Sequence, residues 1–187
     1  MSDVTIEVGT QICFADHGAD FSAASAKTNL EIGASTNVQM NLDDIADTTG
    51  WESVKFDFGA NRAPKYSIMA SIEFAATPTT GAEVELYLAP SPLSAAANGN
   101  PMNIDGADAA APSGIGTLAE LVAACKPIGI FKCTDDPANA VQTAYCGTFS
   151  PPERYGILIV KNESGAAFHS AMDETHIVFT PIIPDVA

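Results

Sequence analysis

The chain has 187 residues, of which 47% are hydrophobic and 7% aromatic, and this is enough for the core of one domain of ordinary size. Its 23 acidic and 8 basic side chains give a formal net charge of −15. Nucleic acids and anionic membrane surfaces are bound by clustered lysine and arginine, so the charge argues against both as partners, and no apolar run approaches the ~20 residues that span a bilayer.

The first residues alternate apolar and polar side chains, with Val4, Ile6 and Val8 on one face. A strand sends successive side chains to opposite faces, so this pattern predicts either a first strand or an N-terminal arm over residues 1–10. An arm of this kind can add a strand to the open sheet edge of a neighbour. Val4, Ile6 and Val8 are therefore the candidate partner-binding residues.

The next segments predict further strands with turns between them. Residues 30–42 predict a strand interrupted near Gly33, and residues 43–47 predict one helical turn. Trp51 opens a strand whose later apolar residues, Phe56 and Phe58, share one face. Residues before and between these segments are small and polar, as in loops.

The clearest alternation lies in residues 66–75 and residues 84–88. A connection of hairpin length, residues 77–81, separates them. We therefore predict that the two segments form an antiparallel hairpin.

A long excursion follows, over residues 90–116, and is rich in proline, alanine, asparagine, glycine and aspartate. Loops of this length in a compact domain are usually functional, so this one is a second candidate contact surface. Residues 117–125 then predict a short helix, because Thr117 can cap it and Glu120 stands at the capping-box position. Pro127 is expected to stop the helix.

The remaining segments, residues 128–133, 141–149, 155–161 and 176–180, predict strands, and Pro181 is expected to end ordered pairing. The unbroken apolar run from Ile157 to Val160 indicates burial on both faces. Roughly eight to ten strands in one domain, residues 1–187, predict an all-β fold. We expect an antiparallel β-sandwich, jelly-roll-like, with one short helix.

Four cysteines are present, and neither a C-x-x-C pair nor a zinc-binding spacing occurs among them. The first residues lack a basic region followed by an apolar core, so no signal peptide is expected. Synthesis in the cytosol would keep the thiols reduced. We expect the cysteines to act as small buried hydrophobic residues.

The polar residues form no pattern that indicates catalysis, a cofactor or a metal. His169 and His176 have no metal-ligand spacing, and we expect them in an ordinary surface loop. Residues 103–108 resemble a calcium loop but lack the third ligand. Asn162 begins an N-glycosylation pattern that is expected to be idle without secretion. We expect no catalytic residue, no cofactor and no metal site.

The order of the segments resembles small structural proteins of tailed bacteriophage virions. The likeness rests on residues 4–10, 66–68, 83–88 and 104–108, and above all on the strand-turn-strand from Arg154 to Thr180. Such proteins carry a β-sandwich, often jelly-roll-like, that decorates or braces the particle. The resemblance implies a non-enzymatic virion protein made in the host cytoplasm. It also implies contacts with the major capsid protein or other virion proteins, and a homo-oligomer, with a trimer favoured.

Three alternatives stay open. The first is a neck or tail component of the particle, and the second is a carbohydrate-binding or host-surface-binding β-sandwich module. An enzyme is the third, and it would need a concave pocket with converging polar groups.

Overall fold

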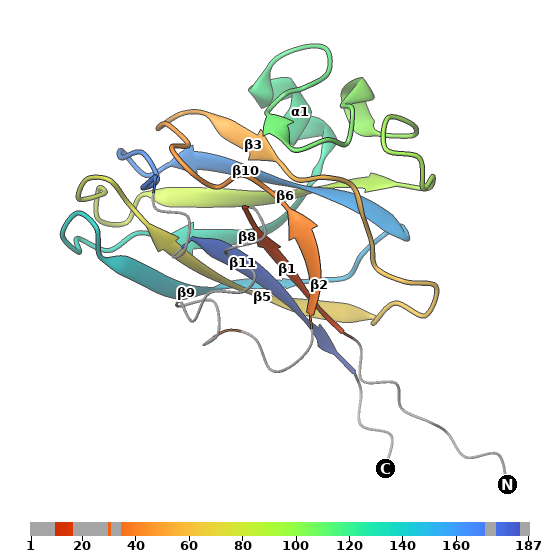
Figure 1. The fold of residues 1–187 in the computed structure, drawn as a ribbon, viewed down its shortest axis with the longest axis horizontal. Helices are drawn as coiled ribbons and strands as arrows, with labels where there is room; N and C mark the ends of the chain where they lie inside the picture. Colours follow the sequence, from red (N-terminus) through yellow and green to blue (C-terminus); the bar gives the residue numbers. More distant parts are fainter. Residues whose placement is uncertain (1–9, 17–29, 31–34, 171–174, 184–187) are drawn as a thin grey trace, which may run out of the picture.

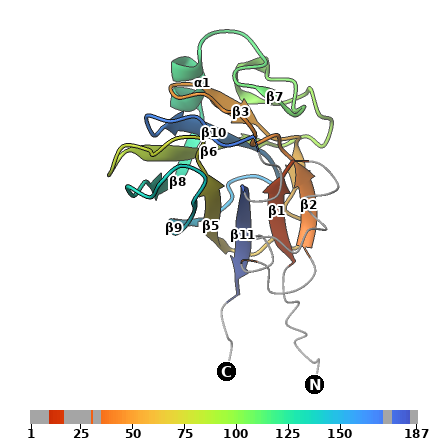
Figure 2. The same cartoon turned by 60° about the vertical axis from the view of Figure 1, so that its left-hand side comes forward.

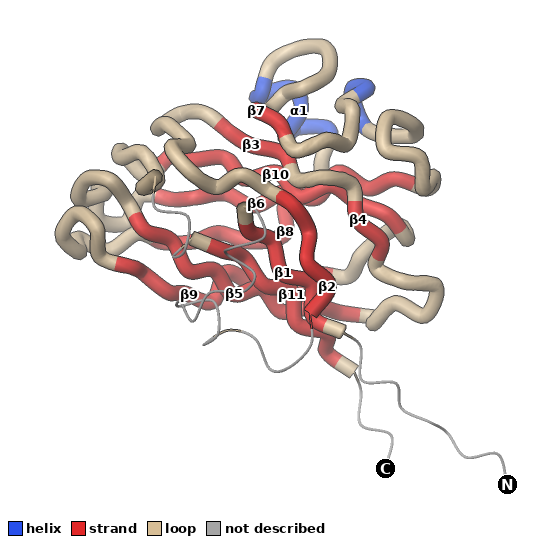
Figure 3. Tube along the Cα trace, viewed as in Figure 1, coloured by secondary structure: helices blue, strands red, loops and turns tan. Residues whose placement is uncertain are grey.

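The structure is a computed structural model that describes residues 10–16, 30, 35–170 and 175–183. Strands dominate, and they form two sheets packed face to face (Figures 1 and 3). The predicted segment Val4–Val8 lies outside the described residues. No helix in the described part is long and apolar enough to cross a membrane.

The first sheet has the strand order β2-β1-β11-β5-β9, and the second has the order β7-β3-β10-β6-β8, with β4 also pairing with β10. The bounds of the strands are β1 Gln11–Ala15, β2 Ser35–Gln39, β3 Gly50–Glu52, β4 Phe56–Asp57, β5 Lys65–Glu73, β6 Glu83–Ser91, β7 Ala109–Ala110, β8 Lys126–Lys132, β9 Val141–Phe149, β10 Tyr155–Glu163 and β11 His176–Ile182. The helical elements are η2 Pro101–Asn103 and α1 Leu118–Ala124.

The connectivity is that of a jelly roll. Without β2, β4 and β7, eight strands remain, and they pair in nested order along the chain: β1 with β11, β3 with β10, β5 with β9 and β6 with β8. All four pairs are antiparallel. A double hairpin rolled into two sheets has this pairing, so the expected antiparallel, jelly-roll-like sandwich with one short helix is confirmed.

The predicted hairpin is wrong. β5 pairs with β11 and β9, whereas β6 pairs with β10 and β8, so the connection crosses from one sheet to the other. Ile68 and Ile72 of β5 and Leu86 of β6 all lie in one buried core. Alternation reports only that one face of each strand is buried, and two faces that meet across a sandwich give the same pattern as two that share a sheet.

The main core lies between the sheets and contains a cluster of phenylalanine rings. Phe14, Phe56, Phe149 and Phe179 contribute, and the centroids of their edge-to-face pairs lie between 4.8 and 6.2 Å apart, a geometry that aromatic pairs favour. The predicted burial of residues 157–160 on both faces is confirmed, because all four are fully buried.

The outer face of the second sheet is covered by residues 92–125, which we call the cap (Figure 2). A second apolar cluster fills the space beneath it: Ala89, Ile104, Leu121, Ile157 and Ile159. The predicted helix is confirmed as α1. Its N-cap is Thr117, and Thr117 and Glu120 form the predicted capping box. The excursion is thus not a bare loop, since it also contains η2 and β7.

Three local predictions were wrong. Residues 43–47 form bends and a turn rather than a helical turn; Asp44 has a φ of 53°. β3 and β4 are two short strands where one was expected. β11 runs past Pro181, which pairs with Tyr66. Among the described residues, β1 pairs with residues 177–179 of β11. Near Pro181 the described part of the chain therefore gives β11 a paired strand on one side only, where a residue without N–H is tolerated.

Candidate functional site

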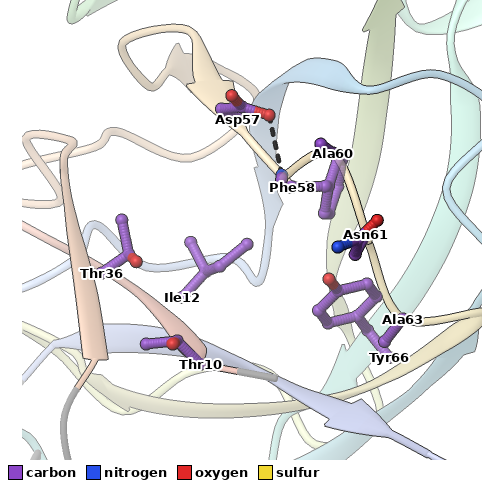
Figure 4. A pocket seen from close by; sticks show the side chains of 10 residues that line it. Thr10, Ile12, Thr36, Asp57, Phe58, Ala60, Asn61, Ala63 and Tyr66 are labelled. Carbon is purple, nitrogen blue, oxygen red and sulfur yellow. Dashed lines mark hydrogen bonds between the residues drawn. The ribbon is translucent and has the colours of Figure 1, made fainter. Parts of the chain in front are cut away.

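One side of the sandwich contains a cavity of about 500 Å³. It lies between the start of β1 and β2 on one wall and the turn from β4 to β5 on the other (Figure 4). Its lining residues are Thr10, Ile12, Thr36, Asp57, Phe58, Gly59, Ala60, Asn61, Ala63 and Tyr66. It is therefore an opening into the main core rather than a cleft on an outer face.

The cavity has an apolar floor and a polar rim. Ile12, Phe58 and Tyr66 are at most 7% exposed, whereas Thr36 and Asn61 are exposed. Figure 4 shows the side chains of Ile12 and Thr36 facing those of Asn61 and Tyr66 across the space. Burial also raises the pKa of Tyr66, so its hydroxyl stays protonated. The cavity can hold an apolar group whose polar end meets hydroxyl and amide groups.

Asp57 is the carboxylate of this lining, and it is fully engaged. Arg154 donates to both of its oxygens, from Nε to Oδ1 at 2.9 Å and to Oδ2 at 3.2 Å, and from Nη2 to Oδ2 at 2.7 Å. The backbone N–H of Gly59 donates to Oδ1 at 2.7 Å (Figure 4). The bond from Arg154 lowers the pKa of Asp57. This carboxylate therefore ties the β4–β5 turn to Arg154, the residue just before β10, and is not poised as a general base.

A second polar group lies beneath the cap, where Glu52 of β3 is fully buried. Ser113 donates to its two carboxylate oxygens, from the backbone N–H at 2.9 Å and from Oγ at 2.8 Å. Burial raises the pKa of Glu52, and burial followed by the charge of Glu52 raises the pKa of Cys125 to about 12. A thiol with that pKa is a poor nucleophile, so the group fastens the cap rather than performs chemistry.

Neither Glu52 nor Ser113 was singled out from the sequence. Glu52 lies in a strand of three residues, too short for its alternation to show which side chains are buried. Ser113 precedes a glycine, as in many turns. The bond joins residues 61 positions apart, and no local pattern records such a pairing.

The aspartates that resemble a calcium loop have other partners. Asp108 accepts from Trp51 Nε1 at 2.6 Å, from the Asn41 N–H at 2.8 Å and from Gln39 Nε2 at 3.1 Å. Asp105 accepts from the backbone N–H of Ala107 at 2.8 Å. In the part of the chain that the structure describes, no group of three or more histidine, cysteine or acidic side chains could hold a metal ion.

The ammonium of Lys55 holds the first part of the cap. Its Nζ donates to Ser91 Oγ at 3.0 Å and to the carbonyl oxygens of Leu93, Ala95 and Asn98 at 3.2, 2.6 and 2.7 Å. Partial burial lowers the pKa of Lys55. One side chain thus fixes the first part of the segment predicted from the sequence to be a second candidate contact surface.

The histidines do not share a surface loop as predicted. His176 is 1% exposed within β11, where it pairs with Ser71 of β5. His169 lies with its Nδ1 3.7 Å from Glu73 Oε2. His176 is the first residue of β11, and the sequence around it gave no sign that its side chain is buried.

Val4, Ile6 and Val8, the predicted partner-binding residues, lie outside the described residues. Thr10, the first described residue, lines the cavity. No family model and no curated protein matches this sequence. The case for a function therefore depends on the geometry and charge of this chain.

Proposed function

We propose that this chain is a non-enzymatic structural protein of a virus particle, a decoration or cement protein that binds the major capsid protein of a tailed bacteriophage. Jelly rolls occur in viral capsid proteins and in lectin domains. A shared fold is only an analogy, whereas the contacts of the polar residues are particular to this chain.

The observation that carries the proposal is that Asp57, Glu52 and Lys161 each make polar contacts with distant segments of the same chain. Arg154 donates hydrogen bonds to Asp57, which lies 97 positions earlier in the sequence. Ser113 donates in the same way to Glu52. Lys161 of β10 bonds Glu85 of β6 at 2.9 Å. These groups brace the sandwich and the cap, as suits a rigid unit that acts through its outer surfaces.

The net charge of −15 supports docking onto a basic surface. Charge complementarity of this kind accelerates association and orients the partners. It also makes binding sensitive to salt, because the Debye length falls from about 10 Å at 0.1 M to about 3 Å at 1 M. A decoration protein attached in this way should leave the particle as the salt concentration rises.

Purified particles from the source of the chain test the proposal. The protein should be present by quantitative mass spectrometry in a fixed ratio to the major capsid protein. Particles stripped of it with salt should release their genome at a lower temperature, and adding it back should restore the original temperature. Absence from particles, or a ratio that varies between preparations, would overturn the proposal.

The rim of the cavity favours one second candidate, a carbohydrate-binding module. Thr10, Thr36 and Asn61 supply hydroxyl and amide groups beside the ring of Tyr66. A sugar bound there would raise the melting temperature by ligand linkage. A thermal-shift screen of mono- and oligosaccharides separates the two functions, since a decoration protein should show no shift.

A further inference from the structure

The two sides of the sandwich are closed in different ways. On one side, β8 and β9 come together although they belong to different sheets, and a Cβ on Gly147 would lie 3.2 Å from the carbonyl oxygen of Ile128. On the other side, between β2 and the β4–β5 turn, the described residues leave the cavity lined by Thr36 and Asn61 (Figure 4).

β2 is the outermost described strand of its sheet. Hydrogen bonds at its C-terminal end show which backbone groups face β1 and which face away from it. The N–H of Met40 donates to Ala15 of β1, whereas the carbonyl of Gln39 faces the other way and accepts from the N–H of Val54. Since backbone groups alternate along a strand, Asn37 faces away from β1 like Gln39. A further strand beside β2 would thus meet Asn37.

The same alternation orients side chains. Thr36 pairs with Ile12 and Val38 pairs with Phe14, and Ile12, Phe14 and Val38 belong to the core. Thr36 lines the cavity. Every second side chain of a strand added beside β2 would therefore point toward the cavity, and these side chains should be apolar.

The chain itself contains a segment of this kind. Residues 1–9 lie outside the described part, and they lead directly into Thr10 at the cavity. Val4, Ile6 and Val8 alternate with Thr5 and Glu7. The segment Val4–Val8 has five residues, the length of β2.

We infer that β2 and the cavity receive residues 4–8 of a second copy of this chain as an added strand, with an apolar side chain of that strand in the cavity. The inference rests on the proposed structural role, in which many copies lie close together. The donor segment and the acceptor groove are different surfaces, so the contact is head to tail and can close a ring such as a trimer.

Two variants of the full-length protein test the two halves of the contact. Ile6→Asp puts a charge on the donor strand, and Thr36→Trp fills the acceptor cavity from an exposed position. Thr5→Asp on the opposite face of the segment and Thr148→Trp at an exposed position of β9 are the matched controls. Circular dichroism and melting temperature check that each variant folds.

Sedimentation velocity over a range of concentrations measures the assembly. The wild type and both controls should self-associate, and each test variant should associate at least about tenfold more weakly. An equimolar mixture of the two test variants should form heterodimers, because the mixture still contains one intact segment and one open groove. A wild type that stays monomeric, or a mixture that stays monomeric, would overturn the inference.

Co-purification with particles is scored separately for the same variants. Self-association that survives both substitutions overturns strand addition and leaves the structural role standing. Self-association that both substitutions weaken, in a protein absent from particles, supports strand addition and overturns the proposed function.

Discussion

Gly129 of β8 lies so close to Cys146 of β9 that a Cβ on the glycine would stand 2.9 Å from the carbonyl oxygen of Cys146. Each strand has a bulge at this place. The pairing of β6 with β8 skips Ile128, and the pairing of β5 with β9 skips Cys146. Bulges bend edge strands and protect them from pairing with other molecules, so two edges from different sheets shield each other here.

Gly129→Ala should destabilise the fold, because the new methyl group meets backbone rather than a flexible side chain. Overpacking of this kind costs about 1–3 kcal/mol. Urea unfolding followed by circular dichroism measures the change, and Thr148→Ala on the exposed face of β9 is the control. A Gly129→Ala protein as stable as the wild type would contradict the close approach of the two strands.

Asn162→Ala should be among the most destabilising single substitutions. The side chain of Asn162 is fully buried and donates to the carbonyl oxygens of Ile45 and Ala166 at 2.9 and 2.8 Å. It also accepts from the N–H of Ser164 at 3.0 Å. Leaving these buried partners unsatisfied should cost about 2–4 kcal/mol. The exposed Asn61→Ala is the control, and an equal loss in both variants would contradict the role of Asn162.

The same burial bears on the glycosylation pattern at Asn162. An oligosaccharide needs an exposed amide, and this amide lies inside the turn that it holds together. If the gene is expressed in a secretory system, intact-mass measurement should find the folded protein unmodified. A folded, glycosylated product would show that the turn opens.

Glu52 should make stability depend on pH in a definite direction. Burial raises its pKa above the ordinary value of 4.5, so the folded state holds this proton more tightly than the unfolded chain does. The contribution of Glu52 to stability is therefore full below pH 4.5 and is lost as the pH rises through the raised pKa. Glu52→Gln cannot ionise and keeps an acceptor for Ser113.

The stability of Glu52→Gln relative to the wild type should consequently increase between pH 4 and pH 7. Free energies of unfolding from urea titrations at several pH values give the comparison, with the exposed Glu153→Gln as the control. A relative stability that stays level or falls over this range would be inconsistent with a desolvated carboxylate at Glu52.

The cysteines should be unreactive in the folded protein. Three of them, Cys13, Cys133 and Cys146, are buried as expected, and Cys125 is half-buried. Burial raises the pKa of Cys133 to about 11 and that of Cys146 to about 12. Ellman's reagent at pH 8 should therefore react slowly with the native protein and rapidly with all 4 thiols in urea. A fast native reaction would contradict this burial.

The sequence predicted what short patterns record. The capping box at Thr117 and Glu120, and the double burial of residues 157–160, follow from local spacing and local hydropathy, and both are confirmed. Eight or more short alternating strands in one domain also favoured the sandwich correctly.

What failed depends on partners far along the chain. The alternation in β5 and β6 could not say that these strands lie in different sheets. The cavity also depends on distant residues, since Thr36 and Asn61 meet only after β1, β2 and the β4–β5 turn are in place. Likewise, the burial of His176 and the clamp of Ser113 on Glu52 arise from tertiary contacts that single residues do not signal.

Cryo-electron microscopy of intact particles from the source of this chain tests the central claim most directly. The account predicts a jelly roll of this connectivity at symmetry-related positions on the head, in contact with the major capsid protein. Density for this jelly roll on the neck or tail would support a structural role but would place the protein there instead of on the head. Particles that lack this jelly roll altogether would contradict the account.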